Sequence, residues 1–323
     1  MPGRGMIVAD LAPRLAVFIG GYVAMLALPW PYDLLGVLPF SIATVSLLGS
    51  WFHDGVHRTV AGSARGITAM RQLAAAPVGF SPRWWYHKHV RLHHRYPGDP
   101  TFDPDIQFGY LGRVTPAQPW RPLHSTQHLT MWLFMPLVTL NMLKPQELWL
   151  ARRYARKLGY RIDTPGWVFL IDKYLPTAIM WTPVFLTHRL SAALFTFLAF
   201  HAITGVLSSI VTQVQHNTTP TVRYGPQSDR HPMCEQLLRS SDVGSAHGIW
   251  WWLCGGVNLH VAHHLAPTLS FLELPAVTAR LRAELRAAGL DVPTHRHIAA
   301  AVASHARLIK SLSRQSPEES SAA

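Results

Sequence analysis

Residues 86–96 read YHKHVRLHHRY, so one short basic segment carries four histidines, His87, His89, His93 and His94. Side chains four residues apart share one face of a helix, so His89 and His93 can converge on one point. Adjacent side chains diverge by about 100 degrees at 3.6 residues per turn, so His93 and His94 are suited to reaching two different metal ions. His87 lies two residues from His89 and would point away, so we do not expect it to be a ligand.

Two further histidine groups have related spacing, HDGVH at 53–57 and HVAHH at 260–264, and a fourth group, QHN at 215–217, holds the single histidine His216. A lone HxxxH often arises by chance, whereas two adjacent pairs, each preceded by a histidine at helical spacing, rarely do. HDGVH also lacks the Glu of the zinc-protease motif HExxH, so the general base of that mechanism is missing. Nine imidazoles can converge in all. This exceeds the three or four ligands of one zinc site and indicates two metal ions.

The composition indicates a protein that contacts something other than water over much of its surface. Only 14% of its 323 residues are charged, against about 25% in an ordinary soluble domain. The formal net charge of +12 suits an anionic bilayer surface, and it would favour an acidic redox partner or a phosphate-bearing substrate. No helix-turn-helix or finger pattern accompanies the charge, so we expect no nucleic-acid partner. Cys234 and Cys254 are too few for a disulfide framework or a four-thiolate cluster, and we expect free thiols.

Two apolar segments near the N-terminus, 11–30 and 33–51, are each close to the ~20 residues that a membrane span needs. Only Pro31-Tyr32 separates them, which predicts a helical hairpin. No convincing small-residue cleavage site lies between the two segments, so we expect a retained anchor rather than a signal peptide.

A second apolar pair, 168–187 and 190–212, predicts another hairpin. Its first member is the weaker span, because the Asp172-Lys173 pair shortens the apolar part. The run 129–143 is too short to span comfortably, and we place it in the membrane interface together with 67–80.

The distribution of basic residues predicts the orientation, because short cytoplasmic segments are enriched in Lys and Arg. The run 151–161, ARRYARKLGYR, holds five such residues, while the hairpin tips carry only Pro31-Tyr32-Asp33 and Arg189. Both tips should therefore face out, and residues 52–165 and everything after about 212 should share the cytoplasmic side. All four histidine groups then lie on that side, and we expect the cell's inner membrane.

The C-terminal part predicts two amphipathic helices. In the first, Val277, Leu281 and Leu285 recur every four residues, and a second apolar stripe runs from Ile298 to Ile309. The tail, 313–323, should be disordered. We expect a single membrane-embedded domain over 1–312.

HDGVH, HVRLHH and HVAHH resemble, in order and spacing, the three histidine boxes of the membrane fatty acyl desaturase and hydroxylase superfamily. WWYHKH before the second box, DPTFDPD after it and GGVNLHVAHHLAP around the third strengthen the likeness, which covers roughly residues 30–312. The resemblance implies an all-α integral membrane protein with about four transmembrane helices in two hairpins and a cytoplasmic helical cap. That cap would hold a histidine-ligated, non-haem di-iron centre. The implied iron ligands, which are also the catalytic residues, are His53, His57, His89, His93, His94, His216, His260, His263 and His264.

The resemblance also implies an oxidation of the substrate in which O2 is the co-substrate. The histidines suit the iron that this oxidation needs, because imidazole is a good ligand for iron. The substrate would be an acyl lipid or acyl thioester. The iron needs electrons from a separate ferredoxin-like or cytochrome-type donor, and the positive surface favours an acidic one. Asp54, Asp103 and Asp105 could orient ligand imidazoles or cap a helix or turn.

We expect an acyl-chain desaturase, although a hydroxylase or an oxidative decarboxylase would use the same boxes. A non-catalytic membrane metal or haem protein is the alternative from another class. A haem protein would need histidines paired at membrane depth, where only His201 lies, and we expect His201 to hydrogen-bond within the bundle. His260 stands where front-end desaturases often have Gln, which argues against that subfamily. The histidines expected at the surface or in packing are His124, His128, His188, His231, His247, His295, His297 and His305.

Overall fold

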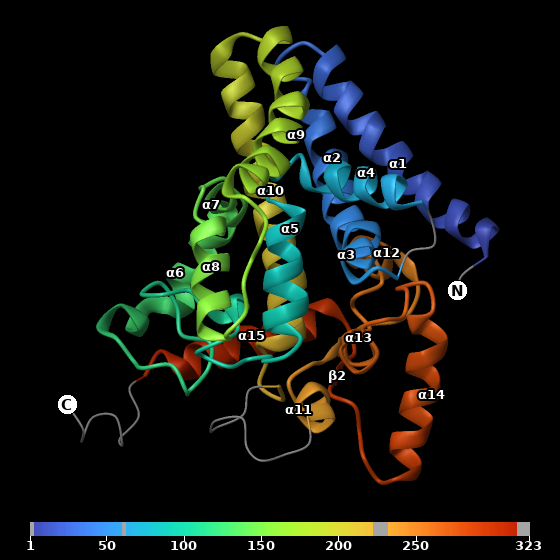
Figure 1. Ribbon diagram of the computed structural model, residues 1–323, viewed down its shortest axis with the longest axis vertical. Coiled ribbons are helices and arrows are strands. Elements are labelled where there is room, and N and C mark those ends of the chain that lie inside the picture. The colour runs from blue at the N-terminus through green and yellow to red at the C-terminus, as the bar shows by residue number, and fades with distance from the viewer. Residues whose placement is uncertain (1–2, 60–62, 222–231, 315–323) are drawn as a thin grey trace.

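The computed structural model describes residues 3–59, 63–221 and 232–314, most of which fold into helices (Figure 1). The elements before residue 145 are α1 (Arg4–Ala27), α2 (Leu34–Leu47), the π-helix η1 (Leu48–Phe52), α3 (His53–His57), α4 (Ala64–Ala75), α5 (Pro82–Trp85), the π-helix η2 (Tyr86–His93), the short helices η3 (Pro104–Ile106) and η4 (Pro122–Thr126), α6 (Gln127–Phe134), η5 (Met135–Leu137) and α7 (Val138–Met142). The later elements are α8 (Glu147–Lys157), α9 (Gly166–Thr187), α10 (Leu190–His216), α11 (Pro232–Leu238), β1 (Asp242–Val243), α12 (Gly248–Cys254), α13 (His260–Leu265), α14 (Leu274–Ala287), β2 (Thr294–His295) and α15 (Ile298–Leu312). The prediction of a mostly helical protein is confirmed.

Three helical segments in the described residues are long and apolar enough to cross a membrane: Gly5–Ala27, Leu34–His57 and Leu190–His216. Large apolar side chains such as Val23 and Leu35 point outward from them. An extended apolar surface of this kind is what contact with lipid requires.

Two of these helices continue past the ends predicted for them. The segment expected to end at 51 runs on through η1 and α3, and the segment expected to end at 212 runs on to the end of α10. The extensions carry His53, His57 and His216. Each helix therefore delivers its histidines directly from the end of an apolar segment.

α9 occupies the predicted span 168–187, but within the described residues it is not among the helices that are long and apolar enough to cross a membrane. The charged pair Asp172-Lys173 explains the difference, because it lowers the mean hydropathy of the helix, and the Lys173 side chain is buried against protein. Its Nζ atom donates to the carbonyls of Met142 and Lys144 (the latter at 2.7 Å) and lies 3.4 Å from Glu147 Oε1. The charge thus fastens α9 to the connection between α7 and α8.

The two segments predicted to lie in the membrane interface are both helical. The run 129–143 is broken around Pro136 into α6, η5 and α7, since proline interrupts a helix. It packs against α10, where Thr139 Oγ1 donates to the His201 carbonyl (2.8 Å). α4 overlaps the run 67–80 and is buried only near its end. The depth of both segments in a membrane stays a prediction.

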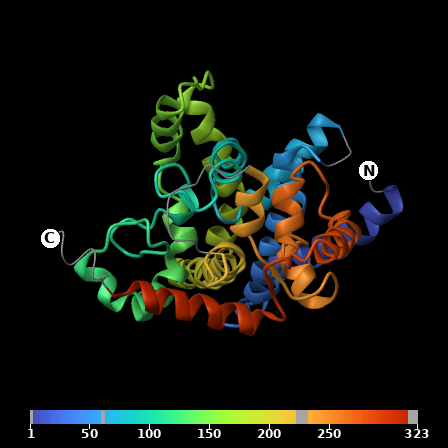
Figure 2. The same ribbon diagram turned by 90° about the horizontal axis from the view of Figure 1, so that it is seen from below.

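The C-terminal elements gather at one end of the molecule, at the bottom of Figure 1 and around the lower half of α10. Viewed from that end, α15 lies across α10 and α6 (Figure 2). α14 and α15 carry the two predicted amphipathic stripes, which confirms both helices. β1 and β2 form a parallel pair that was not predicted, with Asp242 opposite Thr294. Apart from Ser313 and Arg314, the predicted disordered tail lies outside the described residues.

The backbone of η1 lies directly against the turn that follows α12. Gly255 ends α12 with φ +64°, and a Cβ atom there would clash with the backbone nitrogen of Ser50. A Cβ atom at Gly49 would clash with the Cys254 carbonyl. Only glycine fits both positions. This contact fixes the helix that carries His53 against the segment that leads into α13.

Candidate metal centre

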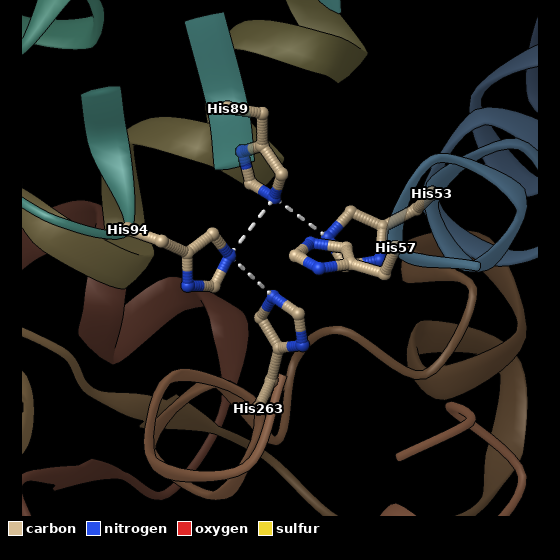
Figure 3. Close-up of side chains that lie close together, drawn as sticks. All are labelled: His53, His57, His89, His94 and His263. Carbon is tan, nitrogen blue, oxygen red and sulfur yellow. Dashed lines mark hydrogen bonds between the residues drawn. The ribbon is translucent and has the colours of Figure 1, made fainter. Parts of the chain in front are cut away.

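The nine histidines named from the sequence meet in two groups, although they come from four separate segments. In each group, the atoms that could bind an ion lie within 4.8 Å of one another. The five-histidine group, drawn in Figure 3, consists of His53, His57, His89, His94 and His263. The four-histidine group consists of His93, His216, His260 and His264.

Adjacent histidines are divided between the two groups, as their spacing predicts. His93 and His264 belong to the four-histidine group, while His94 and His263 belong to the other. The Nε2 atoms of His94 and His263 are 3.0 Å apart, and so are those of His93 and His216. Each adjacent pair therefore links the two groups and holds them side by side.

The second histidine segment departs from α-helical geometry. η2 is a π-helix, and the backbone N–H of His94 donates to the carbonyl of His89 (2.9 Å), five residues earlier. His89 consequently shares its group with His94, at 3.2 Å between Nε2 atoms, while His93 joins the other group. In the two groups, His89 is therefore paired with His94 and not, as predicted, with His93. The reason is that the wider π-turn aligns residues that are five positions apart.

Each member of the four-histidine group uses its Nδ1 atom for a hydrogen bond that points away from the other rings. The acceptors are a carboxylate oxygen of Asp103 for His93 (3.1 Å), the Arg239 carbonyl for His216 (2.9 Å), the Val257 carbonyl for His260 (2.9 Å) and Gln236 Oε1 for His264 (2.6 Å). The Nε2 atoms consequently face one another. That of His260 lies 2.7 Å from His216 Nε2 and 3.1 Å from His264 Nε2.

The tautomers of His216 and His260 follow from these bonds. A carbonyl oxygen only accepts, so the Nδ1 atom of each ring carries the proton of the neutral imidazole. Burial, helped by the neighbouring His216, also lowers the pKa of His260 well below its usual value, which opposes a second proton. Two unprotonated Nε2 atoms therefore stand 2.7 Å apart. Their lone pairs repel unless a cation lies between them, so this donor set fits a metal ion.

The five-histidine group has fewer hydrogen bonds to hold its rings. His53 Nδ1 and His94 Nδ1 are buried without a hydrogen-bond partner in the described structure. Ring contacts support the group instead, since His89 stacks on Trp85 with 5.6 Å between centroids. Burial and then the neighbouring His94 lower the pKa of His89 well below its usual value. The group is therefore a set of neutral imidazoles packed against aromatic side chains.

The three aspartates suggested as orienting groups have different roles. Asp103 accepts from His93 Nδ1 and from the backbone nitrogens of Gly98 (2.7 Å) and Asp105 (2.9 Å). Burial opposes protonation of His93, but the Asp103 carboxylate outweighs it and raises the pKa of His93. Asp105 lies 3.5 Å from the same ring nitrogen, forms a small third group with His93 and His89, and pairs with Lys88.

Asp54 lies in the first box but binds no ring nitrogen closely. Its carboxylate accepts from the backbone nitrogen of Phe271 (3.0 Å) and is 3.9 Å from His53 Nδ1. It therefore joins the first box to the loop after the third box, so its role is to cap a turn.

The remaining described histidines lie outside both groups. His87 stacks on Tyr160 with 6.1 Å between centroids. His201 is buried inside α10, with its Nδ1 atom 3.0 Å from Thr139 Oγ1. His231 falls outside the described residues.

We expect His201→Ala to retain activity within a few-fold and to bind as much metal as the wild type. The side chain packs among aromatic rings far along α10 from His216, so its loss leaves a cavity that lowers stability by about 2–4 kcal/mol. Activity and metal content of the purified variant would check this. Complete loss of metal binding would show that His201 belongs to the centre.

Gln236 and Arg239 contact the histidines but were not predicted. Both lie in or just after α11, where Glu235 pairs with Arg239 (2.6 Å). No spacing relates them to the histidine boxes. Their only signal in the sequence is their position between the fourth long helix and the third box.

A family model described as fatty acid desaturase matches residues 14–295 of the chain. The chain belongs to the fatty acid desaturase family. Curated proteins similar to this desaturase include the sn-1 linoleoyl-lipid 6-desaturases of Synechocystis sp. and Arthrospira platensis. The first is 24% identical over 310 residues, covering 89% of this chain and 82% of that protein. The second is 24% identical over 297 residues, covering 86% and 76%.

A third relative differs in its named substrate. The dihydrorhizobitoxine desaturase of Bradyrhizobium elkanii is 30% identical over 137 residues, which cover 38% of this chain and 37% of that protein. The family match over most of the chain confirms the resemblance seen in the three histidine boxes. The protein is a fatty acid desaturase, an oxidoreductase of the membrane, and its family implies an acyl lipid substrate.

Proposed function

We propose that this desaturase is an O2-dependent di-iron enzyme that introduces a carbon–carbon double bond into a fatty acyl chain held by a lipid or a thioester. The five-histidine group and the four-histidine group would each hold one iron, with the nine histidines as ligands. The facing Nε2 atoms of His216 and His260 carry this proposal, because a metal ion bound between them would satisfy two buried lone pairs that lie 2.7 Å apart. Iron suits the site better than zinc, because zinc has no redox chemistry.

The residues of the chain set where the oxidation takes place. Desaturation removes two hydrogen atoms from adjacent carbons and reduces O2 to two waters, so it also consumes two electrons and two protons from outside the substrate. Bound iron supplies the redox chemistry that activates O2 and breaks the C–H bonds. The carbonyls of Arg239 and Val257 and the carboxylate of Asp103 hold the Nδ1 protons of their imidazoles, which keeps each Nε2 lone pair directed inward.

The arrangement in the membrane is part of the proposal. The first box follows one apolar helix and His216 ends another, so both helices deliver histidines to the same face. α9 would complete a second hairpin with α10, which gives four transmembrane helices in two hairpins. The remaining helices of the single domain 1–312 would form the cap at one end of these hairpins. The basic segment 151–161 supports a cytoplasmic position for that cap, at the cell's inner membrane, because short cytoplasmic segments are enriched in Lys and Arg.

An acidic protein donor, ferredoxin-like or cytochrome-type, would deliver the electrons. A basic surface lies beside the second box, because the buried face of α8 packs on Trp84 and Leu92. The exposed basic side chains of this surface are Arg91, Arg95, Arg152, Arg153, Arg156, Lys157 and Arg161. None of them has a carboxylate partner within the described part of the chain. Such a surface attracts and orients an acidic partner.

Two choices within the family stay open. The same boxes serve hydroxylation and oxidative decarboxylation, and a relative named for dihydrorhizobitoxine shows that the family includes proteins named for other substrates. The argument from His260 against a front-end enzyme stays a prediction, and it contrasts with two relatives that are named linoleoyl-lipid 6-desaturases. That position lies on the carboxyl side of the double bonds already present in a linoleoyl chain.

Mass spectrometry of lipids and metabolites tests the proposed reaction. Cells that express the wild type would be compared with cells that express the His93→Ala, His263→Ala double variant, and iron would be measured in both purified proteins. We expect a wild-type-dependent loss of two hydrogens from an acyl chain, with one iron for each histidine group. The gain of one oxygen would indicate a hydroxylase. An unchanged lipid and metabolite profile, together with a wild-type protein that contains no iron, would indicate that the histidines serve binding or transport and not catalysis.

A further inference from the structure

The side-chain amide of Gln236 lies between the second and third histidine boxes. Its Oε1 atom is 2.6 Å from Nδ1 of His264, and its Nε2 atom is 2.5 Å from the carbonyl oxygen of His94. His264 belongs to the four-histidine group and His94 to the five-histidine group. One neutral side chain therefore connects both groups from outside.

The two partners fix the orientation of this amide. The carbonyl of His94 only accepts, so the NH2 end of Gln236 must face it and the oxygen must face His264. His264 Nδ1 then has to donate, which leaves its Nε2 lone pair directed at His260 Nε2, 3.1 Å away. Gln236 thus selects the tautomer of His264 in which Nε2 is free to bind a metal.

The short segment that carries Gln236 is held firmly against the site. α11 packs against α13, which carries the third box. Arg239 closes the segment with a buried ion pair to Glu235, and its carbonyl accepts from His216 Nδ1. Two of the four imidazoles in the four-histidine group are therefore oriented by residues within 235–239.

We propose that Gln236 is a positioning residue of the metal centre, which fixes the tautomer of His264 and couples it to the backbone of the second box. This inference rests on the proposed di-iron function. The other three acceptors are a carboxylate and two backbone carbonyls. Among the four acceptors, Gln236 is therefore the uncharged side chain. A substitution of similar size at this position can remove the oxygen that accepts from His264 or give that oxygen a negative charge.

The test compares Gln236→Leu and Gln236→Glu with Cys234→Ser, an exposed control on the same helix. Leu removes the acceptor, so we expect metal affinity to fall by about 10–100-fold, as for other partners of ligand imidazoles. Glu keeps the acceptor for His264 and adds a negative charge, but it cannot donate to the His94 carbonyl, so it should restore only part of the affinity that Leu loses. That charge should also lower the reduction potential of the bound iron, because it stabilises the oxidised state. Cys234→Ser should match the wild type.

Metal affinity would be measured by titrating the metal-free proteins with ferrous iron, and the potential by spectroscopic redox titration of the loaded proteins. Recovery of affinity by Gln236→Glu but not by Gln236→Leu, together with a lowered potential, is a result that a purely structural role would not produce. Wild-type affinity in Gln236→Leu, or an unchanged potential in Gln236→Glu, would overturn the inference. Failure of the wild type itself to bind iron would instead overturn the proposed function.

Discussion

Replacing His93 or His263 with alanine is expected to abolish desaturation while the protein stays folded in the membrane. The two residues belong to different groups, so each substitution would remove one proposed ligand from a different one of the two proposed metal positions. Loss of an outer partner of a ligand already costs about 10–100-fold, so loss of the ligand itself should reduce turnover by at least ~100-fold. Turnover with an added electron donor and iron content of the purified variants would measure the effect.

His87→Ala is the matched control for His93→Ala. It removes an imidazole from the same π-helix, but that ring stacks on Tyr160 and belongs to neither group. We expect the control to keep its iron and to stay within about twofold of wild-type turnover, since the half-buried ring belongs to neither group and its Nδ1 atom has no hydrogen-bond partner in the described structure. Full turnover in either His93→Ala or His263→Ala would contradict the assignment of the nine histidines as ligands.

The nine histidines that form the two groups were named from the spacing of the boxes together with the family that these boxes resemble, and His216 was placed by the family pattern. Adjacent residues diverge on any helix, so the division of His93 from His94 and of His263 from His264 could be predicted. The partner of His89 could not be predicted in the same way. The residue that shares a helix face with His89 depends on whether the turn is α-helical or π-helical. No residue pattern in the segment indicates the wider π-turn.

The groups that orient the histidines were harder to foresee. Asp103 follows the second box closely, so its hydrogen bond to His93 could be suggested from the sequence. Gln236 and Arg239 act through contacts with residues far away in the chain, which exist only once the segments between the long helices have packed. Lys173 was recognised as unfavourable in a membrane span, but its burial beside Glu147 depends on tertiary packing.

Gly255→Ala should strongly destabilise the protein and separate the first box from the third. The residue has φ +64°, and a Cβ atom would meet backbone atoms of Gly49 and Ser50, which cannot rotate away as a side chain could. The left-handed conformation costs alanine about 1–2 kcal/mol, and overpacking adds about 1–3 kcal/mol. The total of about 2–5 kcal/mol is a large part of the 5–15 kcal/mol that typically stabilises a folded protein. Thermal unfolding in detergent and iron content would measure the loss.

Gly289→Ala separates the two causes of this loss. Gly289 has φ +74°, close to the value at Gly255, but a Cβ atom there would have no heavy atom within 4 Å. The control should therefore cost only the ~1–2 kcal/mol of the left-handed conformation and should keep its iron. Because η1 leads directly into the first box and the turn after α12 leads into the third, only Gly255→Ala should also lose metal. Equal stability and equal iron content in the two variants would show that the backbone contact between Gly49 and Gly255 does not hold the two boxes in register.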